Sequence, residues 1–204
     1  MKNEPAVVVL AAGAGSRYRG TRHKLSEPLG RDSVLVRTLR NALASELPVV
    51  LVVAETLVGE ARGLVDPGDC VVVDTSSQPT WGMGDSIAAG VSIHASAGGW
   101  LVLPGDMPFV QPATLRAVAE ALDQQPIAYA QHHGRRGHPV GFAAELFSEL
   151  VVLKGDEGAR RLLARYPTAP VELDDAGVLF DIDTVDDLEA ARRRLDVAPS
   201  TALR

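Results

Sequence analysis

Short apolar runs alternate with amphipathic stretches along most of the chain. The runs are rich in Val, Leu and Ala and lack helical spacing, which predicts strands buried on both faces. They lie at residues 6–10, 49–54, 70–73, 100–103 and 127–130, with a shorter one at 171–173. Apolar residues spaced at i, i+3 and i+4 between the runs predict helices. The expected helices span residues 34–47, 56–64, 85–97, 112–122, 144–153, 160–166 and 184–195.

This alternation predicts an α/β fold with a doubly wound, mostly parallel sheet and helices on both of its faces. In such sheets ligands bind beyond the carboxyl ends of the strands, so every loop that follows a strand is a candidate site. The length of 204 residues suits one domain, which we expect to span residues 1–195, followed by a disordered tail at 196–204.

Charge and composition exclude several classes of protein. The net charge is −6, whereas proteins that bind nucleic acid through bulk electrostatics carry a basic excess. Cys70 is the only cysteine, so one chain can form neither a disulfide nor a cysteine metal cluster, and we expect a buried structural thiol. The apolar run at 6–12 is too short to span a bilayer and too polar at its flanks for a signal peptide. We therefore expect a cytoplasmic protein with neither a membrane nor a nucleic-acid partner.

The first strand leads directly into a loop of small residues at 11–16. Such residues let consecutive backbone N–H groups turn toward one point and leave that point accessible to an anion. The same loop then carries four basic residues, namely Arg17, Arg19, Arg22 and Lys24. Together they could neutralise a triphosphate, which predicts a phosphate cradle. For such a loop taken alone, the alternative is a glycine-rich turn beside a solvated basic surface.

Two common glycine motifs do not fit this loop. A dinucleotide-binding fingerprint that starts at Gly13 requires a third glycine, but that position is Tyr18. A P-loop requires Lys and then Ser or Thr after its second glycine, but Gly20 is followed by Thr21 and Arg22.

A tight turn at 104–108 follows the fourth strand and projects Asp106 toward the level of the cradle. A carboxylate that faces phosphates is repulsive unless a cation lies between them, and Mg²⁺ bridging carboxylate and phosphate oxygens is the usual solution. Asp106 therefore predicts a metal ligand, with a turn cap as the alternative. Asp181 and Asp183, near the end of the chain, share one side of an extended segment because alternate residues of such a segment point the same way.

Two further segments carry candidate binding residues. Glycines at 82 and 84 precede a helix that Asp85 or Ser86 could cap, which predicts either a site for an anion or nucleobase edge, or plain helix capping. The loop expected at 132–142 holds Arg135, Arg136 and His138 between glycines, which suits an anionic second substrate. A metal site at its two adjacent histidines is disfavoured, since neighbours on a strand face opposite ways.

Five motifs occur in an order and at a spacing that resemble one family. They are residues 10–13 with Ser16, Arg17 and Lys24; 105–108; 136–140; 155–160; and 181–184. Over residues 5–195, the chain resembles the molybdenum cofactor cytidylyltransferase group of the MobA-like nucleotidyltransferases. Residues 138–139 with 155–160 resemble the cytidylyltransferases in particular. Ala12 does so as well, because the guanylyl-transferring relatives usually carry a glycine there.

The resemblance implies a Rossmann-like fold of the nucleotide-diphospho-sugar transferase type and Mg²⁺-dependent transfer of CMP from CTP to molybdopterin, with release of pyrophosphate. It implies catalytic roles for Arg17, Lys24 and Asp106, with Mg²⁺ held by Asp106 and by Asp181 or Asp183. The implied nucleotide-binding residues are Leu10, Ala11, Ala12, Gly13, Gly15, Ser16, Gly84, Asp85 and Ser86. Those implied to face the acceptor are Arg135, Arg136, His138 and Asp156. A molybdoenzyme that receives the product is a further expected partner.

The chain departs from the family pattern at two places. Residues 17–24 are longer than the usual Arg-Met-Gly-x-x-Lys, with His23 in place of the usual Pro, and Asp85 stands where many members have a small residue. Alternative activities use GTP with molybdopterin or phospholactate, or use a sugar phosphate. A non-catalytic cofactor carrier or chaperone for a molybdoenzyme is a third class. A clamp for a leaving group, formed by Lys24, Asp106 and Asp183, speaks against that class because a carrier needs none.

Overall fold

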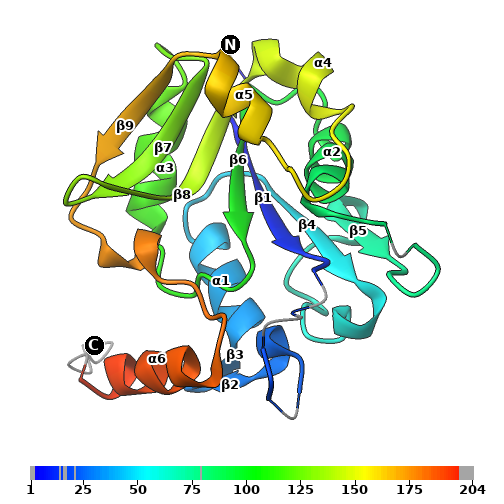
Figure 1. Ribbon diagram of the computed structural model, residues 1–204, viewed down its shortest axis with the longest axis vertical. Coiled ribbons are helices and arrows are strands. Elements are labelled where there is room, and N and C mark those ends of the chain that lie inside the picture. Colours follow the sequence, from blue (N-terminus) through cyan, green and yellow to red (C-terminus); the bar gives the residue numbers. More distant parts are fainter. Residues whose placement is uncertain (1–2, 14, 16–17, 21, 79, 198–204) are drawn as a thin grey trace.

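The computed structural model describes residues 3–13, 15, 18–20, 22–78 and 80–197. Seven strands form one sheet in the order β5-β4-β1-β6-β8-β7-β9 (Figure 1). Their bounds are β1 (Ala6–Ala11), β4 (Val49–Ala54), β5 (Cys70–Val73), β6 (Gly99–Pro104), β7 (Ile127–His132), β8 (Arg135–Ala143) and β9 (Thr168–Glu172). β8 runs antiparallel to both of its neighbours, and the other pairs are parallel. The predicted α/β, mostly parallel sheet is confirmed.

The helices follow the strands as the apolar spacing predicts, but several are shorter than expected. Their bounds are α1 (Val34–Leu43), α2 (Met83–Ile93), α3 (Pro112–Ala121), α4 (Phe147–Leu150), α5 (Arg160–Arg165) and α6 (Val185–Val197). Single 3-10 turns lie at η1 (Lys24–Ser26), η2 (Glu55–Leu57), η3 (Pro67–Asp69), η4 (Ala144–Leu146) and η5 (Ala176–Leu179). A separate two-stranded ladder joins β2 (Pro28–Leu29) and β3 (Asp32–Ser33).

Alternation of side chains along the strands divides the core into two layers. Val7 and Val9 of β1 belong to the layer packed by α1, α3 and α6, whereas Ala6 and Val8 belong to the layer packed by α2, α4 and α5. Because both faces of β1 are covered, its sequence is a continuous apolar run. In Figure 1, α2, α4 and α5 lie on the side of the sheet opposite α3, and α6 crosses the molecule beside β2.

Three predicted helices differ from the structure in instructive ways. The helix expected at 34–47 begins after Ser33, which caps it by accepting from the Val36 N–H at 3.4 Å, but it ends at Leu43. The helix expected at 56–64 is one 3-10 turn followed by irregular turns, and that at 144–153 is a 3-10 turn with a four-residue helix. Gly59 and Gly63 interrupt the first of these two stretches, and glycine is a poor helix former.

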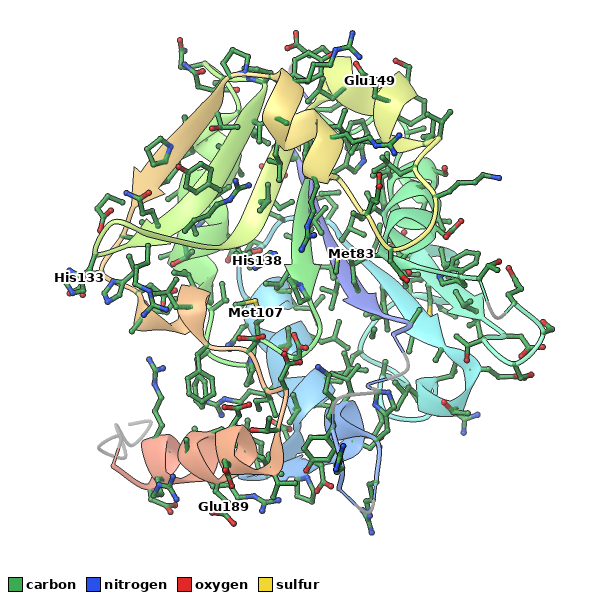
Figure 2. All side chains as sticks on the ribbon, viewed as in Figure 1. Met83, Met107, His133, His138, Glu149 and Glu189 are labelled. Atoms are coloured by element: carbon green, nitrogen blue, oxygen red, sulfur yellow. The ribbon has the colours of Figure 1, made fainter. Side chains whose placement is uncertain are left out.

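The loop expected at 132–142 is wrong, because most of that segment is strand β8. His133 and Gly134 both have positive φ, 49° and 73°, which is the geometry of a two-residue type I′ hairpin loop between β7 and β8. The two histidine rings lie 4.1 Å apart, because His133 is in the turn and does not continue the strand alternation. His133 marks the tip of this hairpin in Figure 2, at the edge of the molecule.

The remaining boundaries shift by a few residues. Residues 181–183 are extended but form no strand, and the final helix ends at Val197, two residues beyond its predicted end. Thr184 caps that helix as predicted, since its Oγ1 accepts from the Asp187 N–H at 3.2 Å. Cys70 begins β5 and is half-buried, and burial raises the pKa of its thiol. Within the described residues, no helix has the length and apolar character needed to span a membrane.

Candidate active site

A cavity of about 400 Å³ opens beyond the carboxyl ends of β1 and β6, where the fold predicts a ligand. Five of the residues predicted to bind nucleotide from the first loop line it, together with Ser86 of α2. Those five are Leu10, Ala11, Ala12, Gly13 and Gly15. Ser16 and Arg17 lie outside the described residues. The other residues that line this cavity include Lys24, Trp81, Gly82, Met83, Asp106, Asp156 and Asp183.

The loop that follows β1 is closed on itself by His23. Gly15 has a φ of +60°, and a Cβ there would lie 3.3 Å from the His23 ring. Nδ1 of His23 accepts from the Leu25 N–H at 3.2 Å, so Nε2 carries the proton and donates to the Gly13 carbonyl at 3.1 Å. His23 therefore holds the ends of the loop together at the position where the family usually has proline.

Lys24 joins the two carboxylates that lie nearest the cradle. Its amine is 2.6 Å from Asp106 Oδ2 and 2.9 Å from Asp183 Oδ1, and the Lys24 side chain is only 12% exposed. Burial is the largest single influence on the lysine and would lower its pKa, but the two carboxylates together outweigh it and leave the Lys24 pKa above its ordinary value. Lys24 is therefore a cation at neutral pH and neutralises part of the charge of this pair.

The turn that carries Asp106 is fixed by backbone contacts to three other segments. The Gly105 N–H donates to the Leu10 carbonyl at 2.8 Å, and a Cβ at Gly105 would lie 2.9 Å from that same oxygen. Thr38 of α1 donates to the Gly105 carbonyl at 2.9 Å, and the Ile182 N–H donates to the Asp106 carbonyl at 3.1 Å. The last bond places the 181–183 segment beside the turn that follows β6.

Asp106 keeps one oxygen for a ligand. Among the described residues, its Oδ1 is buried and has no hydrogen-bond partner, whereas Oδ2 is paired with Lys24. Buried carboxylate oxygens are rarely left without a partner, because desolvation is costly. A cation or a ligand donor would satisfy this atom.

The structure separates the two candidate carboxylates near the end of the chain. Asp183 lines the cavity and contacts Lys24, but Asp181 is not among the lining residues. Burial raises the pKa of Asp181, and the charges of Asp106 and Asp183 raise it further. In the described part of the chain, no three His, Cys, Asp or Glu side chains are arranged to hold a metal ion. The two carboxylates that contact Lys24 are therefore Asp106 and Asp183. Of the two carboxylates near the end of the chain, Asp183 is the one that lines the cavity.

A second cavity of about 450 Å³ adjoins the first and is lined by three of the four predicted acceptor residues, Arg136, His138 and Asp156. Met83 and Asp156 line both cavities. The floor of the second cavity is apolar, formed by Ile87, Val102, Val140, Phe142 and Leu163. Figure 2 shows Met83 and His138 both over the middle of the sheet. The predicted acceptor residue Arg135, at the exposed start of β8, is not among the lining residues.

His138 differs from its expected role. Burial, together with the charge of Arg136, lowers the pKa of His138 to about 4, although Asp181 acts in the opposite direction. The imidazole is neutral at pH 7 and offers one donor and one acceptor, so His138 cannot supply positive charge to an anion. Arg136, whose guanidinium stacks 4.4 Å from the centre of the Tyr129 ring, lines this cavity as a cation, and so does Arg160.

Gly84 and Asp85 contact other parts of the protein. Neither is among the described residues that line the first cavity. A Cβ at Gly84 would lie 2.8 Å from the Lys154 backbone. Asp85 Oδ2 accepts from the N–H groups of Gly82 at 2.9 Å and Gly155 at 2.8 Å. Ser86 Oγ accepts from Trp81 Nε1 at 2.8 Å, which holds the indole on the cavity wall.

Several lining residues carry no signal in the sequence. Met83 begins α2, and Arg160 and Leu163 lie on α5, so apolar spacing and helical charge patterning account for them without any ligand. Trp81 is partly buried, and only its place beside Ser86 marks it. The sequence offers one clue to these lining residues, namely the glycines at 82 and 84 that flank Met83 at the start of the helix.

Comparison with known proteins agrees with this geometry. Residues 7–171 match the family described as the MobA-like NTP transferase domain. The chain is 31% identical over 206 residues to the purine catabolism protein PucB of Bacillus subtilis, covering 94% of this chain and 98% of that one.

Solved structures give the same result. Rv0371c of Mycobacterium tuberculosis superposes with a TM-score of 0.78 at 28% identity, over 93% of this chain and 98% of that one. A structure of Rv0371c in complex with manganese also matches, with a TM-score of 0.75 over 95% of this chain and 100% of that one. A nucleotidyl transferase from Methanothermobacter thermautotroptrophicus matches with a TM-score of 0.74 at 25% identity, over 94% and 97% of the two chains.

The family match covers most of the chain, and the cavity at the carboxyl ends of β1 and β6 lies within it. The predicted nucleotide-diphospho-sugar transferase type of fold is confirmed by these neighbours. The chain belongs to the MobA-like NTP transferase domain family and is a nucleotidyltransferase.

Proposed function

We propose that this enzyme transfers CMP from CTP to the terminal phosphate of molybdopterin and releases pyrophosphate in a Mg²⁺-dependent reaction. The observation that carries the proposal is the Lys24, Asp106 and Asp183 cluster, which lies at the wall of one cavity beside a second one. The choice of cytidine rests on the resemblance at Ala12, at residues 138–139 and at residues 155–160.

An oxygen of the acceptor phosphate attacks the α-phosphorus of CTP, and the bond from that phosphorus to the oxygen of the β-phosphate breaks. Pyrophosphate leaves with the electron pair of that bond. The attacking oxygen is already anionic, so the reaction needs no strong general base and depends on placement and charge neutralisation. The first cavity would hold the nucleotide and the second the acceptor.

The residues present fit a divalent cation. Asp106 has one buried oxygen without a hydrogen-bond partner among the described residues, and Asp183 supplies a second carboxylate beside it. Mg²⁺ is usually held by one or two carboxylates together with phosphate oxygens, so this pair is sufficient. The ion would neutralise charge on the phosphate that is transferred. The manganese complex of Rv0371c, a structural relative, supports the use of a divalent ion.

The chain's own residues divide the remaining work. The backbone N–H groups of the loop after β1 would bind the phosphates, and Lys24 would contribute its positive charge to the leaving pyrophosphate. Arg17 has the same assignment from the sequence but lies outside the described residues. On the acceptor side, Arg136 would attract the anionic substrate, His138 would donate or accept one hydrogen bond as a neutral imidazole, and Asp156 would accept from a hydroxyl or amino group.

The donor and the acceptor are tested together. Purified enzyme is incubated with Mg²⁺ and either CTP or GTP, each with molybdenum-loaded molybdopterin, 2-phospholactate or a sugar phosphate, and pyrophosphate is measured. We expect release only with CTP and molybdopterin, and a cytidylylated product by mass spectrometry. Release with GTP, or only with another acceptor, would replace the proposed substrate by that one.

A carrier or chaperone for a molybdoenzyme is distinguished by the same experiment with a binding readout. Trp81 lines the first cavity, so quenching of tryptophan fluorescence reports nucleotide binding without turnover. Quenching by CTP with no pyrophosphate from any acceptor would favour the carrier. Binding together with acceptor-dependent turnover would support the transferase, and a molybdoenzyme would then receive its product.

A further inference from the structure

Asp85 is not among the residues that line either cavity, but it lies two residues after Met83, which lines both. Its Oδ2 accepts from two backbone N–H groups: Gly82, at the start of α2, and Gly155, in the segment before α5. Both bonds lower the pKa of Asp85, so it is a carboxylate at neutral pH. One side chain thus connects two segments that are far apart in the sequence.

The segment that Asp85 holds is built to lie against the start of α2. A Cβ at Gly82 would come within 2.2 Å of the Gly155 backbone, so only glycine permits this approach. The Gly84 N–H donates to the Gly155 carbonyl at 2.7 Å, and Gly155 itself has a φ of +64°. The bond from the Gly155 N–H to Asp85 is a second polar link between these two segments. Among the described residues, it is the one link between them that involves a charge.

The segment held in this way supplies more of the second cavity than of the first. Asp156 lines both cavities, but Glu157, Ala159 and Arg160 line only the second. The Gly82 side of the contact is also held by α2 itself, because the Ser86 N–H donates to the Gly82 carbonyl at 3.1 Å. Gly155 belongs to no helix or strand and, without Asp85, would keep only the bond from the Gly84 N–H in this contact as the described residues form it. Loss of Asp85 would therefore loosen the wall of the second cavity first.

We infer that Asp85 is a positioning residue that fixes Asp156 and the segment around it at the junction of the two cavities, and so sets the placement of the acceptor relative to the nucleotide. Asp85 does not touch the nucleotide in this account. The inference about the acceptor rests on the proposed function, whereas the attachment of the segment does not. It also gives a reason for a carboxylate at a position where many members of the family have a small residue.

The attachment is tested by limited proteolysis with trypsin. Lys154 is exposed, and the bond that trypsin would cut after it ends at the Gly155 N–H that Asp85 binds. The Asp85→Ala enzyme should be cut after Lys154 about tenfold faster than the wild type. In the variant, this segment can open without breaking a charge-assisted hydrogen bond, so the open form is more populated. Mass spectrometry of the two fragments identifies the site. An unchanged rate at Lys154 would overturn the inference.

Two further variants serve as controls. Asp85→Asn keeps an oxygen that can accept both N–H groups, so its cleavage rate should lie close to that of the wild type. Asp66→Ala removes a carboxylate that accepts from the Gly68 N–H at 2.8 Å in a distant turn, and it should leave cleavage at Lys154 unchanged. Faster cutting in the Asp66 variant would show a general loss of stability, and the inference would fail.

Steady-state kinetics tests the effect on the acceptor. In Asp85→Ala, KM for the acceptor should rise about tenfold while KM for the nucleotide stays within about twofold, and Asp85→Asn should restore most of the acceptor affinity. A rise in KM for the nucleotide alone would mean that Asp85 binds it directly, contrary to the inference. If the wild type releases no pyrophosphate with any acceptor, the proposed function fails, but the trypsin rates still decide whether Asp85 holds the segment.

Discussion

Lys24 lines the first cavity and forms ion pairs with two carboxylates, Asp106 and Asp183. The side chains of Lys24, Asp106 and Asp183 are 12%, 15% and 19% exposed, so their interaction is less screened than that of a surface pair. Without a cation between them, Asp106 and Asp183 would repel each other. The lysine is therefore part of the stability of the site as well as part of its proposed chemistry.

Lys24→Met should destabilise the folded protein by about 1–3 kcal/mol, because it leaves two partly buried carboxylates without a counterion. Mg²⁺ or Mn²⁺ should then raise the melting temperature of the variant more than that of the wild type, since the ion can take the place of the amine. Arg40→Met is the control: Arg40 is 53% exposed in its pair with Asp32, and its loss should change stability little and create no metal effect. Equal metal effects in the Lys24 variant and the wild type would contradict this account.

His138 predicts how stability depends on pH. Its pKa of about 4 in the folded protein lies below the ordinary value of 6.5, so the unfolded chain binds a proton more readily between these two values. The contribution of His138 is therefore fully present above about pH 6.5 and is lost as the pH falls toward 4, with a total of roughly 1–3 kcal/mol.

The measurement is chemical denaturation of the wild type and His138→Gln from pH 7.5 to 4.5. Wild type should lose more stability than the variant over this range, because glutamine does not titrate. Parallel curves for the two proteins would mean that the His138 pKa is ordinary. The same neutral imidazole explains why we assign positive charge on the acceptor wall to Arg136 and not to His138.

At the scale of elements, α2 has the central place because it borders both cavities and packs directly on β1 and β4. Its close approach depends on Gly90, where a Cβ would come within 2.3 Å of Val8 Cγ1 and 3.0 Å of Val52 Cγ2. Alanine is the better helix former by about 1 kcal/mol, so a glycine inside a helix needs such a packing reason. Here the reason is the distance between helix and sheet.

Gly90→Ala should therefore destabilise the protein by about 1–3 kcal/mol, because the added methyl group displaces α2 from the sheet. We expect this loss in spite of the higher helix propensity of alanine. Gly59→Ala provides the comparison, since nothing lies within 4 Å of a Cβ at that position. The free energy of unfolding from urea titration decides the matter. A Gly90 variant as stable as the wild type would show that α2 and the strands can move apart without cost.

The sequence predicts the strands well and the antiparallel insertion poorly, for a physical reason. Apolar runs such as Val49–Ala54 identify strands that are buried on both faces whatever their neighbours. The apolar pattern of β8 is interrupted by Arg136, Gly137 and the His138–Pro139 pair. The segment is a strand because it pairs with β6 and β7. Gly137 is itself a tertiary requirement, because a Cβ there would lie 2.1 Å from the Val178 carbonyl oxygen.

The candidate site divides in the same way. Lys24 and Asp106 could be found because each follows a strand, and parallel strands bring such loops to one edge of the sheet. From the sequence, Asp85 can either bind a ligand or cap the helix, and the structure shows the cap through Gly82. Its second backbone partner, Gly155, is distant in sequence, and nothing local reveals it. The pairing of Lys24 with Asp183 is equally non-local, and Met83 looks like an ordinary helix residue until the second cavity is seen.

At the scale of the whole molecule, the two cavities meet at Met83 and Asp156, and the Lys24 cluster lies on the wall of the first. In the proposed reaction, this arrangement would place the nucleotide in one cavity and the acceptor in the other, next to each other. It accounts for a family whose members share the nucleotide half of the site and could differ in the acceptor half. Under the proposed function, the transfer depends above all on Asp106 and Asp183.

The most direct measurement is acceptor-dependent release of pyrophosphate by the wild type and by Asp106→Asn, at saturating Mg²⁺ and CTP with molybdenum-loaded molybdopterin. Asparagine keeps the size of the side chain and removes its charge, so binding of CTP followed by Trp81 fluorescence should persist. We predict that kcat falls by at least about 10²-fold, the loss seen when one group that stabilises a transition state is removed. Turnover by Asp106→Asn within a few fold of the wild type would contradict the account.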